Sequence, residues 1–134
     1  MIKIRKATIK DIEKLVSLDR EANKEIKWWA LMKRSEFFSL IKKKLVYVAE
    51  ENKNIVGYIN GEITDKQLIL DNIYVKKEFR NKGVAKKLIN KLLLDIKRLK
   101  FKDIRIDCPE RLRKFYKKFG FKTTALIMKR RLRK

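Results

Sequence analysis

Hydrophobic and polar positions change their spacing several times along the chain, and each change predicts a different element. Residues 2–7 alternate between apolar and polar side chains, which predicts a first strand. Three further runs are rich in β-branched and aromatic residues and predict strands joined by short turns: residues 45–49, 55–63 and 67–75, with turns at 50–54 and 64–66. Because the turns are short, we expect an antiparallel meander.

Four other segments show helical spacing. A first helix follows Thr8–Asp11, which resembles a capping box, and continues to about Ala22. A second, short helix is expected at Ser35, whose side chain suits a helix cap. The longest amphipathic run begins after Gly83 and places these apolar residues on one face: Val84, Ala85, Leu88, Ile89, Leu92, Leu93, Ile96 and Leu99.

The C-terminal third adds one more helix between two strands. Residues 102–107 predict a strand that is reached through a helix and is therefore parallel to its neighbour. Pro109 suits the first position of a fourth helix, and Gly120 suits the position just after it. Phe121 to Met128 predicts a last strand before the basic tail 129–134. The pattern predicts a single α/β (α+β) domain over residues 1–134, with a mostly antiparallel sheet that is parallel at one strand pair.

The turn before the longest helix has the composition of an anion site. It consists of Arg80, Asn81, Lys82, Gly83, Val84 and Ala85. Amides at a helix N-terminus lack intrahelical acceptors and carry the positive end of the helix dipole. Gly83 lets a ligand approach the backbone, and Arg80 and Lys82 add charge. Phosphate or pyrophosphate would suit this turn, although an ordinary basic loop is the alternative.

Composition narrows the possible chemistry. The chain carries 38 Lys and Arg against 16 Asp and Glu, a net charge of +22. Such a charge attracts nucleic acid, anionic lipid or phosphorylated cofactors, but AT-rich or thermophilic genomes also produce it. With no His and one Cys, we expect no imidazole metal site, no His-based triad and no intrachain disulfide. No apolar run reaches the roughly eighteen residues of a membrane span, and residues 1–5 do not resemble a signal peptide, so a cytoplasmic protein is expected.

Two motifs taken together resemble the GCN5-related N-acetyltransferase (GNAT) family. The family pattern is an apolar-x-Val step, then Arg/Gln-x-x-Gly-x-Gly/Ala opening a helix, and later Tyr-x-x-x-Gly-Phe. This chain has Ile73-Tyr74-Val75, then Arg80 to Ala85, then Tyr116 to Phe121. The predicted element order also matches the family from Ile2 to about Phe121. The resemblance implies a twisted sheet flanked by about four helices, in which the parallel strand pair splays apart.

The resemblance further implies acetyl-CoA as the co-substrate. Its pyrophosphate would lie on the amides of residues 80–85, and its pantetheine arm would pair with the backbone of Ile73 and Val75, on either side of Tyr74. A backbone N–H near Val75 would polarise the thioester carbonyl. A primary amine would attack directly, so Cys108 is not needed as a nucleophile and is interpreted as a small packed residue.

Two proton transfers are then required. Tyr116 matches the family tyrosine that donates a proton to the CoA sulfur. Asp107 is the first candidate for the general base, with Asp71, Glu62 and water as alternatives. Asp107 could instead cap the helix that begins at Pro109.

The chain also departs from the family pattern. Pro109 stands where the family often has an Asn that contacts the cofactor, and the final hairpin is short. The wall of the acceptor pocket is therefore expected to be incomplete or supplied by another subunit, as in a homodimer. Trp28 and Trp29 fit either a lid over the core or an aromatic wall of a substrate cleft.

The sequence leaves the acceptor and the partner open. A protein N-terminus, a lysine or a small amine would each serve as acceptor. The alternative function is a non-catalytic member of the family that binds nucleic acid or a ribosome through its basic surface.

Overall fold

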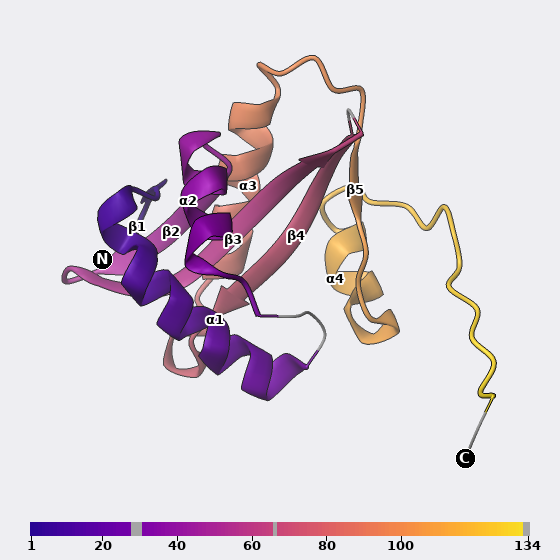
Figure 1. The fold of residues 1–134 in the computed structure, drawn as a ribbon, viewed down its shortest axis with the longest axis horizontal. Helices are drawn as coiled ribbons and strands as arrows, with labels where there is room; N and C mark the ends of the chain where they lie inside the picture. The colour runs from indigo at the N-terminus through magenta and orange to yellow at the C-terminus, as the bar shows by residue number, and fades with distance from the viewer. Residues whose placement is uncertain (28–30, 66, 133–134) are drawn as a thin grey trace.

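The structure is a computed structural model that describes residues 1–27, 31–65 and 67–132. Within these residues a five-stranded sheet has the spatial order β1-β2-β3-β4-β5 (Figure 1). Its strands are β1 (Lys3–Lys6), β2 (Val46–Glu51), β3 (Asn54–Thr64), β4 (Gln67–Val75) and β5 (Ile104–Ile106). The first four pair antiparallel, and β5 pairs parallel to β4. This confirms the mixed, mostly antiparallel sheet.

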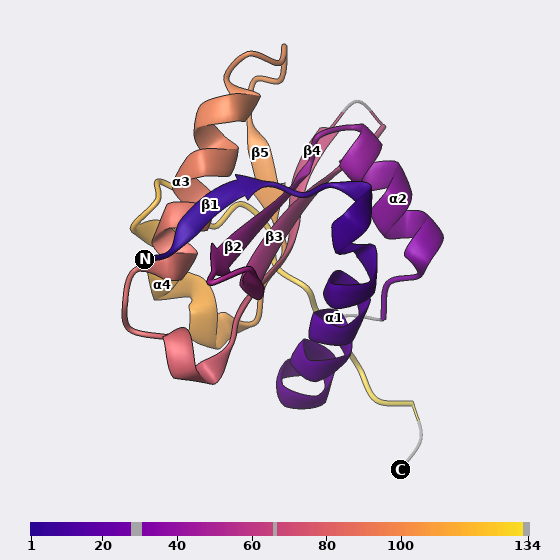
Figure 2. The same ribbon diagram turned by 90° about the vertical axis from the view of Figure 1, so that its left-hand side faces the viewer.

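The helices cover both faces of the sheet. They are α1 (Ile12–Ile26), α2 (Arg34–Lys42), α3 (Val84–Ile96) and α4 (Arg113–Lys117). Figure 2 shows α1 and α2 on one side of the sheet and α3 and α4 on the other. Each side has its own core: Phe37 and Tyr58 are buried in the first, and Ile59 and Leu88 in the second. Tyr58 and Ile59 are neighbours because successive strand residues point to opposite faces.

The predicted capping box at Thr8–Asp11 is confirmed, although it caps the 3-10 turn before α1, and the predicted cap of α2 is wrong. The Thr8 amide donates to Asp11 Oδ2 at 2.7 Å, and a 3-10 turn over Ile9–Asp11 then leads into α1. Ser35 lies inside α2, whose N-cap is Lys33. The Lys33 amide donates to the Glu36 carboxylate at 2.9 Å, so an acidic residue in the first turn replaces the expected hydroxyl cap.

Several boundaries differ from the prediction. The turn after β2 is only two residues, Asn52 and Lys53, which both have positive φ as a tight hairpin requires. α3 ends at Ile96, so Leu99 lies beyond it and is exposed. Pro109 is the N-cap of a 3-10 turn over Glu110–Leu112, not the first residue of a helix. Trp28 and Trp29 lie outside the described residues.

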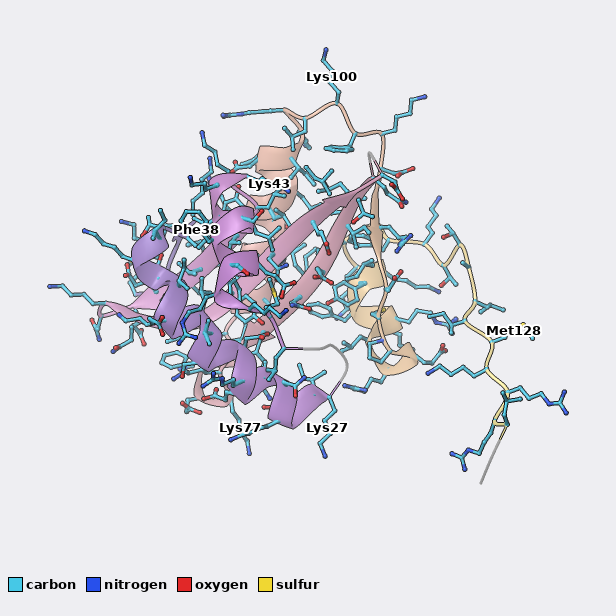
Figure 3. The ribbon with its side chains drawn as sticks, in the orientation of Figure 1. Lys27, Phe38, Lys43, Lys77, Lys100 and Met128 are labelled. Atoms are coloured by element: carbon cyan, nitrogen blue, oxygen red, sulfur yellow. The ribbon has the colours of Figure 1, made fainter. Side chains whose placement is uncertain are left out.

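The predicted last strand, Phe121 to Met128, is wrong. Residues 121–132 form neither strand nor helix, and the segment runs away from the body of the protein (Figure 1). Leu126 and Met128 are 80% and 90% exposed, and Met128 lies at the periphery in Figure 3. A strand needs a paired neighbour, and the adjacent edge strand, β5, is only three residues long. The strand propensity of residues 121–128 was therefore not sufficient to form a strand.

None of the helices in the described residues is both long enough and apolar enough to cross a bilayer.

Candidate functional site

The second half of β4 has an open edge. Its parallel pairing with β5 ends at Leu70 and Ile106, while β4 continues to Val75. The Lys76 amide donates to the Val56 carbonyl at 2.8 Å, so by antiparallel alternation Tyr74 also bonds to β3. The backbone groups of Ile73 and Val75 therefore point away from β3, toward the edge that β5 has left. This is the arrangement expected for these two residues.

The turn into α3 presents unpaired amides, but the Arg80 amide, which the sequence analysis included among them, donates to the Lys77 carbonyl at 3.3 Å. The first intrahelical bond runs from the Lys87 amide to the Gly83 carbonyl at 3.0 Å, so the amides of residues 84–86 have no acceptor within the helix. Gly83 has φ +76°, and a Cβ placed there would meet no atom within 4 Å. The backbone is thus accessible, and open space for an anion lies beside it.

The Arg80 side chain contacts two other elements of the fold. Its guanidinium lies 2.7 Å from the Glu25 carboxylate on α1, and its Nε donates to the Val75 carbonyl at 2.9 Å. It also lies over the Tyr74 ring, 5.4 Å from the centroid. The pairing lowers the pKa of Glu25 and raises that of Arg80. Arg80 therefore fastens α1 to the end of β4, a contact between residues 55 positions apart that no local spacing revealed.

Tyr116 is buried on α4, with 5% of its surface exposed. Its ring packs edge-on against Phe115 and Phe121. Burial, and secondarily the nearby Cys108 thiol, raise the pKa of Tyr116 above its ordinary value. Within the described part of the chain no side-chain hydrogen bond engages its hydroxyl. The phenol therefore stays protonated at neutral pH and keeps its proton available for a ligand.

The structure separates the candidate bases. Asp107 forms an ion pair with Arg105, Oδ1 to Nε at 3.2 Å, and it does not cap the turn at Pro109. Asp71 occupies a bulge of β4, since Asn60 pairs with Asn72 and Gly61 with Leu70. Its solvent-facing carboxylate is still partly desolvated.

The surroundings of Asp71 favour its protonated form. Partial desolvation raises its pKa first, followed by the negative charge of Glu62, with smaller effects of Asp107 and Asp19. The neighbouring Asn60 amide acts in the opposite direction without reaching hydrogen-bonding geometry. A carboxylate with a raised pKa accepts protons more readily than an ordinary Asp.

Sequence reasoning missed two asparagines beside this bulge. Asn60 on β3 and Asn72 on β4 are 0% and 2% exposed. Both polar atoms of the Asn60 side chain and Oδ1 of Asn72 lack a hydrogen-bond partner in the described residues. Their signal in the sequence was a polar residue at an inward-facing position on each of two adjacent strands.

Comparison with known proteins assigns the family. A family model described as an acetyltransferase (GNAT) domain matches residues 42–123, more than half of the chain. The chain belongs to the GNAT family. The family assignment and the fold expected from the sequence motifs are thereby confirmed. The matched residues include the open half of β4, the turn into α3 and Tyr116.

Solved structures show the same fold over nearly the whole chain. One is a predicted acetyltransferase with acetyl-CoA from Clostridium acetobutylicum, with 23% identity, coverage of 98% of this chain and 97% of that chain, and a TM-score of 0.77. Another is the PaiA N-acetyltransferase of Thermoplasma acidophilum with coenzyme A, with 22% identity, coverage of 95% and 93%, and a TM-score of 0.80. A third is the glucosamine-6-phosphate N-acetyltransferase of Arabidopsis thaliana, with 21% identity, 99% of each chain and a TM-score of 0.71. A comparison with curated protein sequences gave no match.

Proposed function

We propose that this GNAT protein is an acetyl-CoA-dependent N-acetyltransferase that transfers acetyl directly to a primary amine. The observation that carries the proposal is the open edge of β4 leading into the unpaired amides of the turn before α3. The similar structures from Clostridium acetobutylicum and Thermoplasma acidophilum were solved with acetyl-CoA and coenzyme A, which supports the same co-substrate here.

The residues present fit this co-substrate. Amides of the turn, from Asn81 to Lys86, would hold the pyrophosphate, and the space beside Gly83 leaves room for it. The Val75 amide and the backbone of Ile73 would pair with the pantetheine arm as an added strand does. Acetyl-CoA supplies an acetyl group activated as a thioester. Arg80, which already binds the Val75 carbonyl, would hold the end of β4 in place.

Two side chains would move the protons. Asp71 would take the proton that the amine must lose, because its carboxylate is free of an ion pair in the described residues whereas Asp107 is paired with Arg105. Tyr116 would give the proton of Oη to the departing sulfur. The new amide bond forms as the bond between acetyl carbon and sulfur breaks, so no acyl-enzyme and no role for Cys108 as nucleophile is needed.

The test has two independent readings. Calorimetry measures whether acetyl-CoA binds, and thiol release measures acetyl transfer to a panel of amines and peptides with free N-termini. We expect micromolar binding and amine-dependent thiol release that Asp71→Asn abolishes. Binding without release to any acceptor would reject the enzymatic function, and the absence of binding would reject the co-substrate as well.

A further inference from the structure

Negative charge is concentrated where β4 and β5 separate. Glu62 on β3, Asp71 on β4 and Asp107 just after β5 approach this point from three strands. The charges that raise the pKa of Asp71 are those of Glu62, Asp107 and Asp19, all of them acidic. The chain as a whole has a net charge of +22, so this acidic surface has the opposite sign to the protein as a whole.

Two of these carboxylates have no ion-pair partner among the described residues. Arg105 pairs with Asp107, but no ion pair within residues 1–27, 31–65 and 67–132 reaches Glu62 or Asp71. Two uncompensated negative charges that lie close together repel each other, and a bound cation would relieve the repulsion.

The two buried asparagines give a second, independent sign of a ligand. Both polar atoms of Asn60 and one of Asn72 have no hydrogen-bond partner in the described residues. Leaving such groups unpaired costs about 1–3 kcal/mol each. Asn60 lies beside the Asp71 carboxylate, since its amide alters the pKa of that group. A ligand that enters at Asp71 therefore meets polar atoms that lack partners.

The spacing of the acidic groups favours an extended organic cation over a metal ion. Among the described residues no three His, Cys, Asp or Glu side chains converge closely enough to hold one metal ion. A ligand with two positive charges separated by an alkyl chain satisfies carboxylates that are near each other but do not converge.

We infer that this acidic surface binds an acceptor with two positive charges, an alkyl diamine, whose reacting amine faces Asp71 while its second ammonium lies at Glu62. The inference rests on the proposed function, because it names the acceptor of the same reaction. The asparagine side chains hydrogen-bond the reacting amine, and Glu62 determines the preference for a second charge.

The test measures thiol release at low salt for two acceptors, 1,4-diaminobutane and n-butylamine. Both have a four-carbon chain, and only the first has a second amine. We expect kcat/KM to be at least about tenfold higher for the diamine, since two desolvated charge contacts replace one. Glu62→Gln should bring the ratio of the two kcat/KM values toward one, mainly because the KM of the diamine rises. Glu51→Gln, the same change beside the turn between β2 and β3, should leave the ratio unchanged.

Direct binding separates failure of this inference from failure of the proposed function. Calorimetry of 1,4-diaminobutane and n-butylamine against the protein with coenzyme A present should show tighter binding of the diamine that weakens with added salt. Equal binding and equal turnover of the two amines would overturn the diamine inference and leave the N-acetyltransferase standing. Faster transfer to the N-terminus of a peptide that has no charged side chain would do the same. Preferential diamine binding without any thiol release would reject the enzyme and retain the site.

Discussion

Tyr116 and Asp71 have opposite environments, and each environment suits one proton transfer. Tyr116 is enclosed by aromatic rings that keep its phenol protonated. Asp71 stands on a bulge among other acids, which favours uptake of a proton. The pKa shifts of both residues follow from position in the fold, so substitutions at these two residues test the mechanism most directly.

Tyr116→Phe should lower kcat by roughly 10²- to 10⁴-fold, the usual contribution of a general acid, with acetyl-CoA binding retained. Tyr47→Phe is the matched control, because it also removes a phenol from the α3 face of the sheet. The Tyr47 hydroxyl donates to Asp95 at 2.6 Å, so its loss should cost about 1 kcal/mol of stability and leave kcat intact. Steady-state kinetics and thermal unfolding of both variants check this. Unchanged turnover in Tyr116→Phe would remove that residue from the mechanism.

The raised pKa of Asp71 should be visible in both activity and stability. Turnover should rise with pH as this carboxyl loses its proton, at pH values above the usual range of Asp. The fold favours the protonated form, so the stabilising contribution is complete below the unfolded-state pKa and is lost as pH rises through the folded-state pKa. Asp71→Asn stays neutral and should raise the melting temperature at pH 7 while abolishing transfer, and the stability gain should vanish below about pH 4. A variant that is less stable at pH 7 would contradict the assignment.

At the scale of elements, the open edge of β4 and the turn into α3 each present unpaired backbone donors, and a 3-10 turn over Lys77–Phe79 separates them. Arg80 joins them, because it binds the last carbonyl of β4 and the Glu25 carboxylate on α1. The charged side chain of Arg80 thus holds the end of β4 against α1. The amides of the turn into α3 remain available for a ligand. A Cβ added at Gly83 would enter the open space beside the amides of the turn.

Gly83→Ala should weaken acetyl-CoA binding by about tenfold and lower stability by about 1–2 kcal/mol, the cost of a left-handed conformation for a residue with a Cβ. Gly120→Ala is the matched control. It also has a positive φ, +90°, and open space at the Cβ position, but it lies at the end of α4. Calorimetry and chemical denaturation should show the same loss of stability in both variants and a loss of affinity only in Gly83→Ala. If both variants bound acetyl-CoA with equal affinity, the pyrophosphate would not lie at the turn before α3.

At the scale of the whole molecule, basic side chains project from many elements. Figure 3 shows Lys27, Lys77 and Lys100 pointing outward from different parts of the surface. The segment after Thr123 adds further basic residues to an extended chain with exposed apolar side chains. This segment therefore offers exposed positive charge to a polyanion.

Removal of residues 124–134 should leave the free energy of unfolding within about 0.5 kcal/mol, because substitutions and deletions at exposed positions remove few core contacts. Phe121, which packs against the core beside Tyr116, is retained in the shortened chain. Elution from a phosphate-bearing resin should shift to lower salt as positive charges are lost. Thermal unfolding and the salt gradient measure the two effects. A large loss of stability would show that the segment packs in solution.

The sequence predicted the site better where function depends on local backbone than where it depends on distant contacts. Gly83 and the start of α3 follow from local spacing and β4 follows from the strand pattern, whereas the open edge of β4 was implied by the resemblance to the GNAT family. The link between Glu25 and Arg80, and the position of Asp71 beside Asn60, depend on how separate elements pack. Phe121 to Met128 had the composition of a strand, but whether a strand forms depends on a neighbouring edge that composition does not describe.

The position of Cys108 has a practical consequence. It is the only thiol in the chain, it is half-buried at the end of β5, and it lies near Tyr116. Alkylation of native protein by iodoacetamide, followed by mass spectrometry, would therefore report on one spot without any engineering. Occupation by coenzyme A should slow this labelling several-fold, whereas inorganic phosphate should not. Such protection would give an occupancy readout for ligand screens before any acceptor is identified.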